Sequence, residues 1–249
     1  MEIKRRNFQG VLNILSFNRH FYVFGFIALT LIVASQYLLD WNMGLFWLVI
    51  FGFIYGLGMP LIVSAYVYDL SGFYHFDWLK KMNLEDSDEK FNLNINAGFD
   101  ETSFILKNIL PKSNLQVYDF YNAEQHTEPA IVRARKVSMF YPNTQEIDSD
   151  KIPLEESSVD NIFLLSAIHE IRDHEEKVAF LKECRRVCKP DGNVIMVEHL
   201  RDFPNFIAFT IGFTHFFSSA TWQRAFREAG FLSINEAKFT PFMSVFDCR

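Results

Sequence analysis

Two long uncharged runs near the start of the chain constrain its fold most strongly. They extend from Phe21 to Leu39 and from Met43 to Tyr68, and a break of only a few residues separates them. Each run is long enough for a helix that crosses the apolar core of a bilayer, which takes about 20 residues. Since backbone polar groups in lipid must pair within their own segment, we predict two antiparallel transmembrane helices.

The flanks of the two runs are basic, with Lys4, Arg5, Arg6, Arg19, Lys80 and Lys81. Cytoplasmic flanks of membrane helices are enriched in Lys and Arg, so both ends of the hairpin are expected in the cytoplasm. This predicts a two-pass protein of the cytoplasmic (inner) membrane, with the rest of the chain in the cytoplasm. Two alternatives stay open. The first run could be a signal peptide cleaved near Ala34-Ser35, although the second run argues for an anchor. Both runs could also be buried or interfacial helices, although neither shows a polar stripe.

The composition excludes several classes of function. Of the 249 residues, 49% are hydrophobic, so the chain can bury a full domain core in addition to the two runs. A net charge of -6 provides no basic surface, and we predict no nucleic-acid partner. The cysteines Cys184, Cys188 and Cys248 form neither a disulfide framework nor a set of four metal ligands, so we predict no metal.

From residue 91 onward, short apolar runs alternate with segments of helical periodicity. The expected strands are 91–96, 115–119, 137–140, 159–165, 194–197, 233–240 and 242–248, and the expected helices are 101–110, 124–135, 175–188 and 221–229. This alternation predicts a parallel sheet with right-handed crossovers, closed by an antiparallel edge. We therefore expect a basic N-terminus (1–20), a hairpin (21–68), a surface-lying interfacial connector (69–90) and an α/β domain (91–249).

A glycine turn, Asn94-Ile95-Asn96-Ala97-Gly98-Phe99-Asp100, follows the first expected strand. Parallel sheets bind ligands where a strand opens into a turn and a helix N-terminus, although such a turn can also be purely structural. Asp119 ends the second expected strand, 21 residues after Gly98. A carboxylate there can accept both hydroxyls of a ribose, which favours a nucleoside ligand.

Three further motifs follow in order: Ile152-Pro153-Leu154, Val159-Asp160-Asn161-Ile162-Phe163 and Arg186-Val187-Cys188-Lys189-Pro190-Asp191-Gly192. Together with the glycine turn they resemble class I S-adenosylmethionine-dependent methyltransferases, over about Phe91 to Cys248. The resemblance implies an α/β fold with a Rossmann-like, doubly wound, mostly parallel seven-stranded sheet, here preceded by two transmembrane helices. It also implies S-adenosyl-L-methionine as the cofactor. The family's first loop usually reads Asp-x-Gly-x-Gly-x-Gly, and only its central glycine is kept here, as Gly98.

The resemblance further implies a set of cofactor-binding residues, namely Asn94, Asn96, Ala97, Gly98, Asp100, Asp119, Asp148 and Ser166. Among them, Asp119 matches the family's ribose carboxylate. Asp148 lies four residues before Ile152 and matches the acidic position that usually faces the adenine. An ordinary surface aspartate is an equally good interpretation of Asp148.

His169 and Glu170 follow the fourth expected strand, where the family places the transferring methyl and its acceptor. They rank first as catalytic residues, since a histidine near its normal pKa can take a proton from a hydroxyl at neutral pH. The alternative is an orienting or helix-capping pair. Glu198 and His199 end the fifth strand beside the same crevice and are expected to shape the substrate pocket.

The segment from Phe203 to Phe217 is rich in phenylalanine and carries little charge. In related small-molecule methyltransferases the corresponding insertion forms a lid over the acceptor. Its composition predicts an apolar substrate pocket that includes Phe209 and Phe213, or a flap that dips into the membrane, although an extra core helix would have the same composition. His215 is expected to make a satisfied polar contact.

These observations predict a membrane-anchored, S-adenosylmethionine-dependent methyltransferase that acts on a lipophilic small molecule drawn from the bilayer. The motifs are nearest in style to quinone-ring methyltransferases, so a phenol, a quinone or a polyene-bearing ring is expected as the acceptor by analogy. A phospholipid or fatty acyl acceptor is the alternative. A different class of function is also open, in which the loosened loop has lost methyl transfer and the chain is a membrane-tethered cofactor-binding or assembly module.

Overall fold

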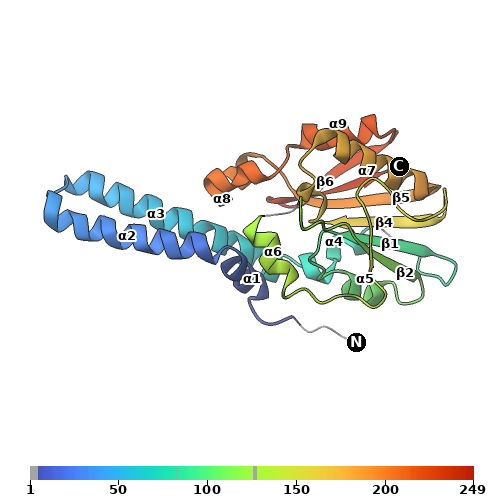
Figure 1. Ribbon diagram of the computed structural model, residues 1–249, viewed down its shortest axis with the longest axis horizontal. Coiled ribbons are helices and arrows are strands. Elements are labelled where there is room, and N and C mark those ends of the chain that lie inside the picture. The colour runs from blue at the N-terminus through green and yellow to red at the C-terminus, as the bar shows by residue number, and fades with distance from the viewer. Residues whose placement is uncertain (1–4, 83, 126–127) are drawn as a thin grey trace.

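The structure is a computed structural model that describes residues 5–82, 84–125 and 128–249. Lys4, counted above among the basic flanking residues, lies outside the described residues. The chain forms a long helical hairpin that projects from an α/β domain (Figure 1). The hairpin consists of α2 (Arg19–Leu39) and α3 (Met43–Ser64). Asn42 caps the second helix by accepting hydrogen bonds from the backbone N–H groups of Gly44 and Leu45.

The α/β domain is built on a seven-stranded sheet with the order β3-β2-β1-β4-β5-β7-β6. Its strands are β1 (Phe91–Asn96), β2 (Asn114–Asp119), β3 (Gln145–Glu146), β4 (Val159–Leu165), β5 (Cys188–His199), β6 (Ile234–Thr240) and β7 (Met243–Cys248). The first five strands are parallel, and β7 is antiparallel to both of its neighbours. This confirms the predicted Rossmann-like fold. The strand order reverses between β1 and β4, so the loops that follow these strands meet at a topological switch point.

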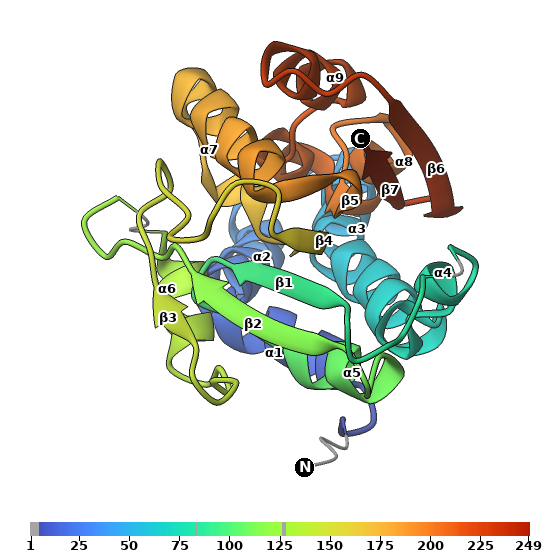
Figure 2. The ribbon, with the colours of Figure 1, turned by 90° about the vertical axis from the view of Figure 1, so that its right-hand side faces the viewer.

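Helices cover both faces of the sheet (Figure 2). The domain helices are α5 (Ser103–Ile109), α6 (Pro129–Arg135), α7 (His174–Val187), α8 (Phe203–Phe209) and α9 (Ser219–Glu228). The face covered by α7 and α9 buries Phe180, Leu181, Trp222 and Phe226 against the central strands. Because β4 is covered on both faces, all of its residues are buried, as expected for a continuous apolar run.

The opposite face of the sheet is covered in part by the segment that follows the hairpin. This segment contains the π-helical turn η1 (Ala65–Leu70), the 3-10 turn η2 (Phe73–His75) and α4 (Asp77–Lys80). Phe73, Phe76, Trp78 and Leu79 are at most 5% exposed and share a core cluster with residues of β4, β5 and β7. This differs from the surface-lying connector expected from the sequence. The inner end of the hairpin is therefore continuous with the core of the domain.

The first helix, α1 (Gln9–Phe17), lies between the base of the hairpin and α6 (Figure 1). Asp69 of η1 accepts hydrogen bonds from the backbone N–H groups of Gly10 and Val11, at 2.9 and 3.3 Å. A carboxylate at a helix N-terminus is favourable because the first amide groups have no partner within the helix. The contact fixes α1 on the turn that ends the hairpin.

Two expected elements differ from the structure. The strand predicted at 137–140 does not form, and Gln145–Glu146 pair with β2 as β3 instead. Val137, Met139 and Phe140 are 45–58% exposed, so their apolar pattern does not mark a core strand. The helix predicted at 124–135 is shorter, because α6 begins at Pro129, a residue suited to the first turn of a helix; residues 126–127 lie outside the described residues. Residues 189–192, part of the third motif, form an irregularity within β5, between its pairings with Val159 and Asn161.

Candidate functional site

The candidate site lies where β1, β2, β4 and β5 end at the same edge of the sheet. Asn96, the last residue of β1, connects two strands and the loop. Its Nδ2 donates to the carbonyl oxygen of Tyr118 on β2 at 3.2 Å, and its Oδ1 accepts from the backbone N–H of Gly98 at 3.0 Å. Gly98 has φ +88°, a left-handed conformation that glycine adopts without steric cost. The loop thus keeps a tight turn although it lacks two of the usual glycines.

Asp100 fixes the other end of this loop. Its Oδ1 accepts from the backbone N–H groups of Thr102 and Ser103, both at 2.9 Å, where α5 begins. The Nδ2 atom of Asn94 donates to the hydroxyl of Ser103 at 2.7 Å. Burial raises the pKa of the Asp100 carboxyl, and its hydrogen bonds to Ser103 and Thr102 oppose that shift. These residues shape the loop through their side chains, and Ala97 is buried beside them.

Asp119 ends β2, at the predicted position, and is 1% exposed; its carboxylate already has partners within the protein. Oδ1 accepts from the backbone N–H of Tyr121 at 2.9 Å, and Oδ2 forms an ion pair with Arg135 of α6. The guanidinium of Arg135 lies 4.5 Å from the centre of the Tyr121 ring and also pairs with Glu146 at 2.9 Å. A Cβ atom at position 98 would lie 3.0 Å from the Tyr121 side chain. Tyr121 therefore packs against Gly98, and Arg135 covers the carboxylate of Asp119.

The N-terminal segment covers the same loop from outside. The ring of Phe17, at the end of α1, packs edge-on against Phe99, with 5.2 Å between ring centres. Glu101 receives hydrogen bonds from Arg5 at 2.6 Å, Asn13 at 3.1 Å and Tyr74 at 2.7 Å. The loop after β1 is consequently held by the two segments that flank the hairpin.

Ser166 and Asp148 have different surroundings. Ser166 follows β4 with φ +52°, an uncommon conformation for a residue other than glycine, and its hydroxyl is buried without a hydrogen-bond partner. Asp148 is exposed on the loop after β3. Ser166 thus lies at the switch point with Asn94 and Gly98, while the position of Asp148 suits either interpretation offered for it.

His169 lies in the short turn η3 (Ile168–Glu170) after β4, between two carboxylates. Its Nδ1 is 2.8 Å from Oε2 of Glu198, which is 1% exposed, and its Nε2 is 3.5 Å from Oε1 of Glu170. Burial alone would lower the pKa of His169, but the charge of Glu198 and the hydrogen bonds to Glu170 and Glu198 outweigh burial and raise this pKa to about 10. The imidazole is therefore protonated at neutral pH, unlike the neutral base expected from the sequence. In this state it can attract an anionic oxygen.

His199 has a connecting role at the end of β5. Its Nε2 is 2.9 Å from the hydroxyl of Tyr68 in η1, and its Nδ1 is 3.0 Å from the carbonyl oxygen of Phe242. The ring of Phe216 stacks on it at 4.9 Å. Burial lowers the pKa of His199 to about 4, so the ring is neutral at neutral pH. His199 joins the end of the hairpin to the sheet.

The phenylalanine-rich segment forms α8 and the 3-10 turn η4 (Thr210–His215). Phe209 lies with its ring centre 5.4 Å from that of His199, and Phe213 packs on Phe206 at 5.1 Å. Arg172 fixes the end of η4, because its guanidinium donates to the carbonyl oxygens of both His169 and His215, at 3.1 and 2.6 Å. The ring centres of these two histidines are 5.2 Å apart. Neither the approach of His215 to His169 nor the contact between Arg135 and Asp119 is predicted by a sequence motif.

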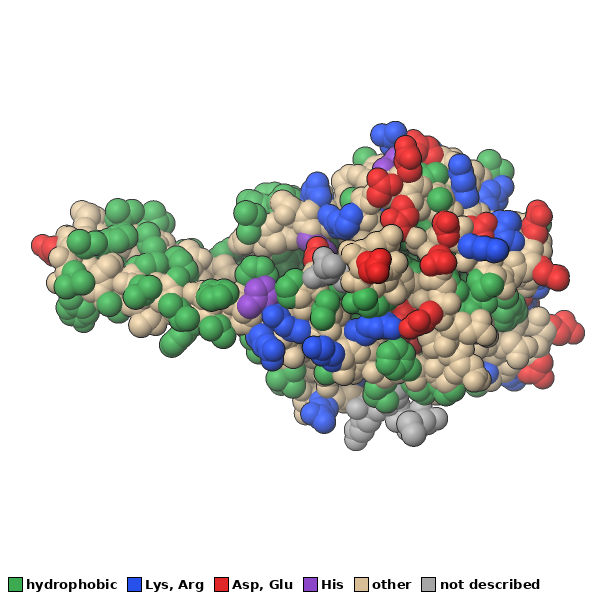
Figure 3. Space-filling view, viewed as in Figure 1, with side chains coloured by type: hydrophobic (Ala, Val, Ile, Leu, Met, Phe, Trp, Pro, Cys, Tyr) green, Lys and Arg blue, Asp and Glu red, His purple; other side chains and the backbone are tan. Residues whose placement is uncertain are grey.

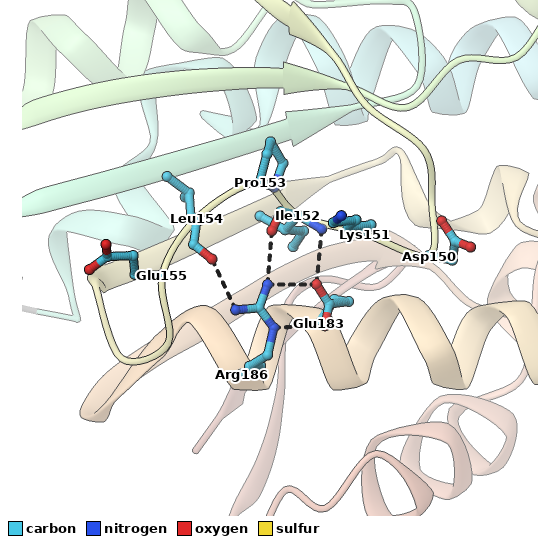
Figure 4. Close-up of a pocket in the computed structure, with 8 residues that line it drawn as sticks. All are labelled: Asp150, Lys151, Ile152, Pro153, Leu154, Glu155, Glu183 and Arg186. Carbon is cyan, nitrogen blue, oxygen red and sulfur yellow. Dashed lines mark hydrogen bonds and ion pairs between the residues drawn. The ribbon is translucent and has the colours of Figure 1, made fainter.

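A surface pocket lies beside Ile152-Pro153-Leu154 (Figure 4). Arg186 of α7 donates to the carbonyl oxygens of Leu154 and Ile152, at 2.9 and 2.8 Å, and pairs with Glu183 at 2.7 Å. Glu183 in turn accepts from the backbone N–H of Ile152 at 3.0 Å. These contacts satisfy one another, so we assign this motif to bracing the loop between β3 and β4.

Comparisons with known proteins agree with this geometry. Residues 108–196 match a family described as "Methyltransferase domain". The chain therefore carries a methyltransferase domain. Among solved structures, the methyltransferase resembles a SAM-dependent methyltransferase from Aquifex aeolicus, with 18% identity, a TM-score of 0.52, and coverage of 76% of this chain and 97% of that one. It also resembles a protein from Pyrococcus horikoshii, with 14% identity, a TM-score of 0.51, and coverage of 70% and 86%. At these identities the likeness is one of fold. None of the curated proteins matches the sequence.

The cofactor of the methyltransferase is S-adenosylmethionine, and the residues at the strand ends fit it in two respects. Asn94 Oδ1, Asp100 Oδ2 and Ser166 Oγ are buried without a hydrogen-bond partner, and the ammonium and carboxylate of the methionine moiety offer complementary groups. Asp119 offers acceptor atoms for the ribose hydroxyls. Because Arg135 already holds one of these oxygens, Arg135 and the ribose compete for the same carboxylate.

Proposed function

We propose that this methyltransferase is anchored in a membrane by α2 and α3 and methylates a lipophilic acceptor taken from the same bilayer. Both helices are long and apolar enough to span a membrane, and no residue of α2 is buried. With 21 residues, α2 is roughly 30 Å long, about the thickness of the apolar core. Figure 3 shows hydrophobic side chains over the projecting hairpin, and Lys and Arg side chains where it meets the domain. This distribution supports a domain on the cytoplasmic side.

The observation that carries the proposed acceptor class is the position of α8 and η4. We call this segment, residues 203–215, the lid. The hydroxyl of Tyr55 on α3 donates to the carbonyl oxygen of Ile207 on the lid at 2.6 Å. Phe203, Phe206 and Ile211 on the lid are 72%, 46% and 83% exposed. Exposed apolar groups that adjoin an apolar hairpin favour contact with lipid.

The lid also reaches the candidate catalytic residues, because it ends at His215 beside His169. A single segment therefore connects the hairpin with the ends of β4 and β5. We infer that a lipophilic molecule leaves the bilayer beside α3 and moves along the lid to His169. This arrangement supports a lipophilic acceptor more directly than a soluble one.

When bound, S-adenosylmethionine supplies a methyl group on a positively charged sulfur, which a nucleophile displaces in line. The protein then has to hold the acceptor near attack geometry and exclude water. His169, held by Glu198 and Glu170, is placed to orient an acceptor oxygen, and the phenylalanines of the lid exclude water. We infer an oxygen nucleophile on a phenol-like or quinone-derived ring, with a fatty acyl or phospholipid oxygen as the second candidate. The match to the methyltransferase domain does not favour a non-catalytic module.

The experiment is to incubate the full chain in vesicles of membrane lipid extract with methyl-labelled S-adenosylmethionine. We expect label in the organic-soluble fraction, and we expect Asp119→Ala to reduce it strongly. Mass spectrometry of the labelled lipid identifies the acceptor. Label that appears only in the aqueous or protein fraction would contradict the proposed acceptor class.

A further inference from the structure

Three potential metal ligands meet at the acceptor end of the crevice. They are His169 and Glu170 of η3 and His215 at the end of the lid, and their ligand atoms all lie within 4.8 Å of one another. Nε2 of His169 is 3.5 Å from Oε1 of Glu170, a spacing that two ligands of one metal ion at about 2.0–2.2 Å can adopt. The side chains of His169, Glu170 and His215 are 17%, 13% and 30% exposed. The group is therefore sheltered and still accessible from solvent.

A carboxylate lies near Nδ1 of each of the two histidines. Glu198, buried in β5, binds Nδ1 of His169 at 2.8 Å, so that Nε2 is directed toward Glu170. Nδ1 of His215 lies 3.6 Å from Glu128. A carboxylate on the far nitrogen of a histidine is the arrangement that fixes the tautomer and the ring direction of metal ligands. Glu198 makes this contact with His169 at hydrogen-bond distance, whereas Glu128 lies near His215 beyond that distance.

The backbone of the group is also fixed. Arg172 donates to the carbonyl oxygens of His169 and His215, two residues that are 46 positions apart in the sequence. Among the described residues, the charges around the group include the carboxylates of Glu170, Glu198 and Glu128, the guanidinium of Arg172 and the ammonium of Lys177, and His199 approaches from β5. These carboxylates outnumber these two cations, so the described surroundings favour a positive ion.

We propose that His169, Glu170 and His215 bind a divalent transition-metal ion of the Zn²⁺ type. Two imidazoles and one carboxylate suit Zn²⁺, whereas Mg²⁺ prefers oxygen ligands only. The ion takes the position of the proton on Nε2 of His169. Three protein ligands leave one coordination position open, as in catalytic zinc sites, and an acceptor oxygen can occupy it. This role in acceptor binding rests on the proposed function, and it narrows the acceptor to molecules with a hydroxyl or carboxylate oxygen at the methylated position.

The experiment uses the full chain, purified in detergent and freed of metal with a chelator. Zn²⁺ is titrated calorimetrically, and Co²⁺ is titrated while its visible absorption is recorded, because that spectrum reports the nitrogen and oxygen ligands directly. The test variants are His215→Ala and Glu170→Gln. The matched control is His174→Ala, since His174 and Glu228 form an ion pair of 2.7 Å elsewhere on the surface. Circular dichroism establishes that each variant is folded.

We expect one equivalent of Zn²⁺ to bind the wild type and the control with equal affinity, and affinity at least tenfold lower in each test variant. Equal Zn²⁺ affinity in wild type and His215→Ala, or no saturable binding to the wild type, would overturn the proposed site. Titration of S-adenosylmethionine on the same samples distinguishes failure of the proposed metal site from failure of the proposed function. Cofactor binding without Zn²⁺ binding rejects the metal site alone, and Zn²⁺ binding without lipid methylation rejects the acceptor alone.

Discussion

At the scale of single residues, hydrogen bonds hold the loop after β1 in shape at positions where the class I methyltransferases that its sequence resembles usually have glycine. Asn96 and Asp100 stand at two of the glycine positions and bind backbone N–H groups of the loop and of α5. Gly98 alone has a positive φ in this loop, and Tyr121 leaves no room for a side chain there. Side-chain hydrogen bonds therefore hold this loop at positions where glycine would give it conformational freedom.

Arg135 determines access to the ribose carboxylate. The change Arg135→Ala removes the ion pair with Asp119, so ribose hydroxyls no longer compete for that oxygen. We expect about tenfold tighter binding of S-adenosylmethionine, since a hydrogen bond to a charged group contributes about 1.5–3 kcal/mol. Calorimetric titration of the detergent-purified chain measures the affinity, and Lys136→Ala, an exposed position one residue further, is the control.

A double-mutant cycle tests the same competition. Asp119→Ala should weaken cofactor binding by about 1–3 kcal/mol, because it removes the acceptor of the ribose hydroxyls. In that background Arg135→Ala should have no further effect on affinity. If Arg135→Ala tightens binding equally with and without Asp119, the competition that we describe is not the cause.

The sequence predicted the position of several candidate site residues at the ends of strands, and their roles stay predictions. Asn96, Gly98, Asp119, Ser166 and His169 all lie at the edge of the sheet that the alternation of strands and helices implied. The contacts that Arg135 and His215 make could not be predicted, because both residues come from segments whose path depends on tertiary packing.

At the scale of elements, the predictions from the sequence are wrong where the local residue pattern and the tertiary packing disagree. The apolar residues at 137–140 resemble a strand, but they lie exposed and a two-residue strand pairs with β2 instead. The aromatic residues of 73–79 resemble an interfacial surface, but they fill the core against β5 and β7. Both segments are apolar, as the sequence shows. Whether their apolar side chains are buried or exposed depends on which other elements pack against them.

Asp160 on β4 connects three elements. It accepts from the backbone N–H of Phe91 at 3.0 Å and pairs with Lys90 and Lys189, at 3.3 and 2.7 Å. Burial would raise its pKa, but the hydrogen bonds to Lys189, Phe91 and Lys90 together lower it from the usual 3.8. Its contribution to stability is therefore present above about pH 4 and is lost as the pH falls through the lower value of the folded state.

We expect Asp160→Asn to reduce the free energy of unfolding by about 1–3 kcal/mol at pH 7. The difference from wild type should shrink below about pH 4, where the wild-type carboxyl is progressively protonated. Urea unfolding followed by tryptophan fluorescence measures both effects, with the exposed Asp191→Asn as control. A difference that persists unchanged at pH 3 would show that charge at position 160 is not the cause.

The lid should affect the acceptor and not the cofactor. Replacing Phe203, Phe206 and Ile211 together with Ser removes exposed apolar groups without opening the core. We expect a higher lipid-extract content of the vesicles to be needed for half-maximal methylation, with unchanged affinity for S-adenosylmethionine. Leu232→Ser, at a residue 91% exposed and outside the lid, is the control. A parallel loss of cofactor affinity would indicate that the lid only stabilises the fold.

At the scale of the whole molecule, the hairpin and the domain share packing. η1, η2 and α4 continue from α3 into the core, while α1 precedes α2 and packs on α6. Tyr68 and His199 add a hydrogen bond between the end of the hairpin and β5. We infer that this packing fixes the crevice at a constant height above the bilayer, which suits an enzyme that takes its acceptor from the membrane.

The central claim is that the acceptor comes from the bilayer in which the enzyme is anchored. The measurement compares methyl transfer when the enzyme and the lipid extract share one vesicle with transfer when they are in separate, non-exchanging vesicles at the same total concentrations. The account predicts labelled lipid from the shared vesicles and little from the separate ones. Equal rates in the two arrangements would contradict it.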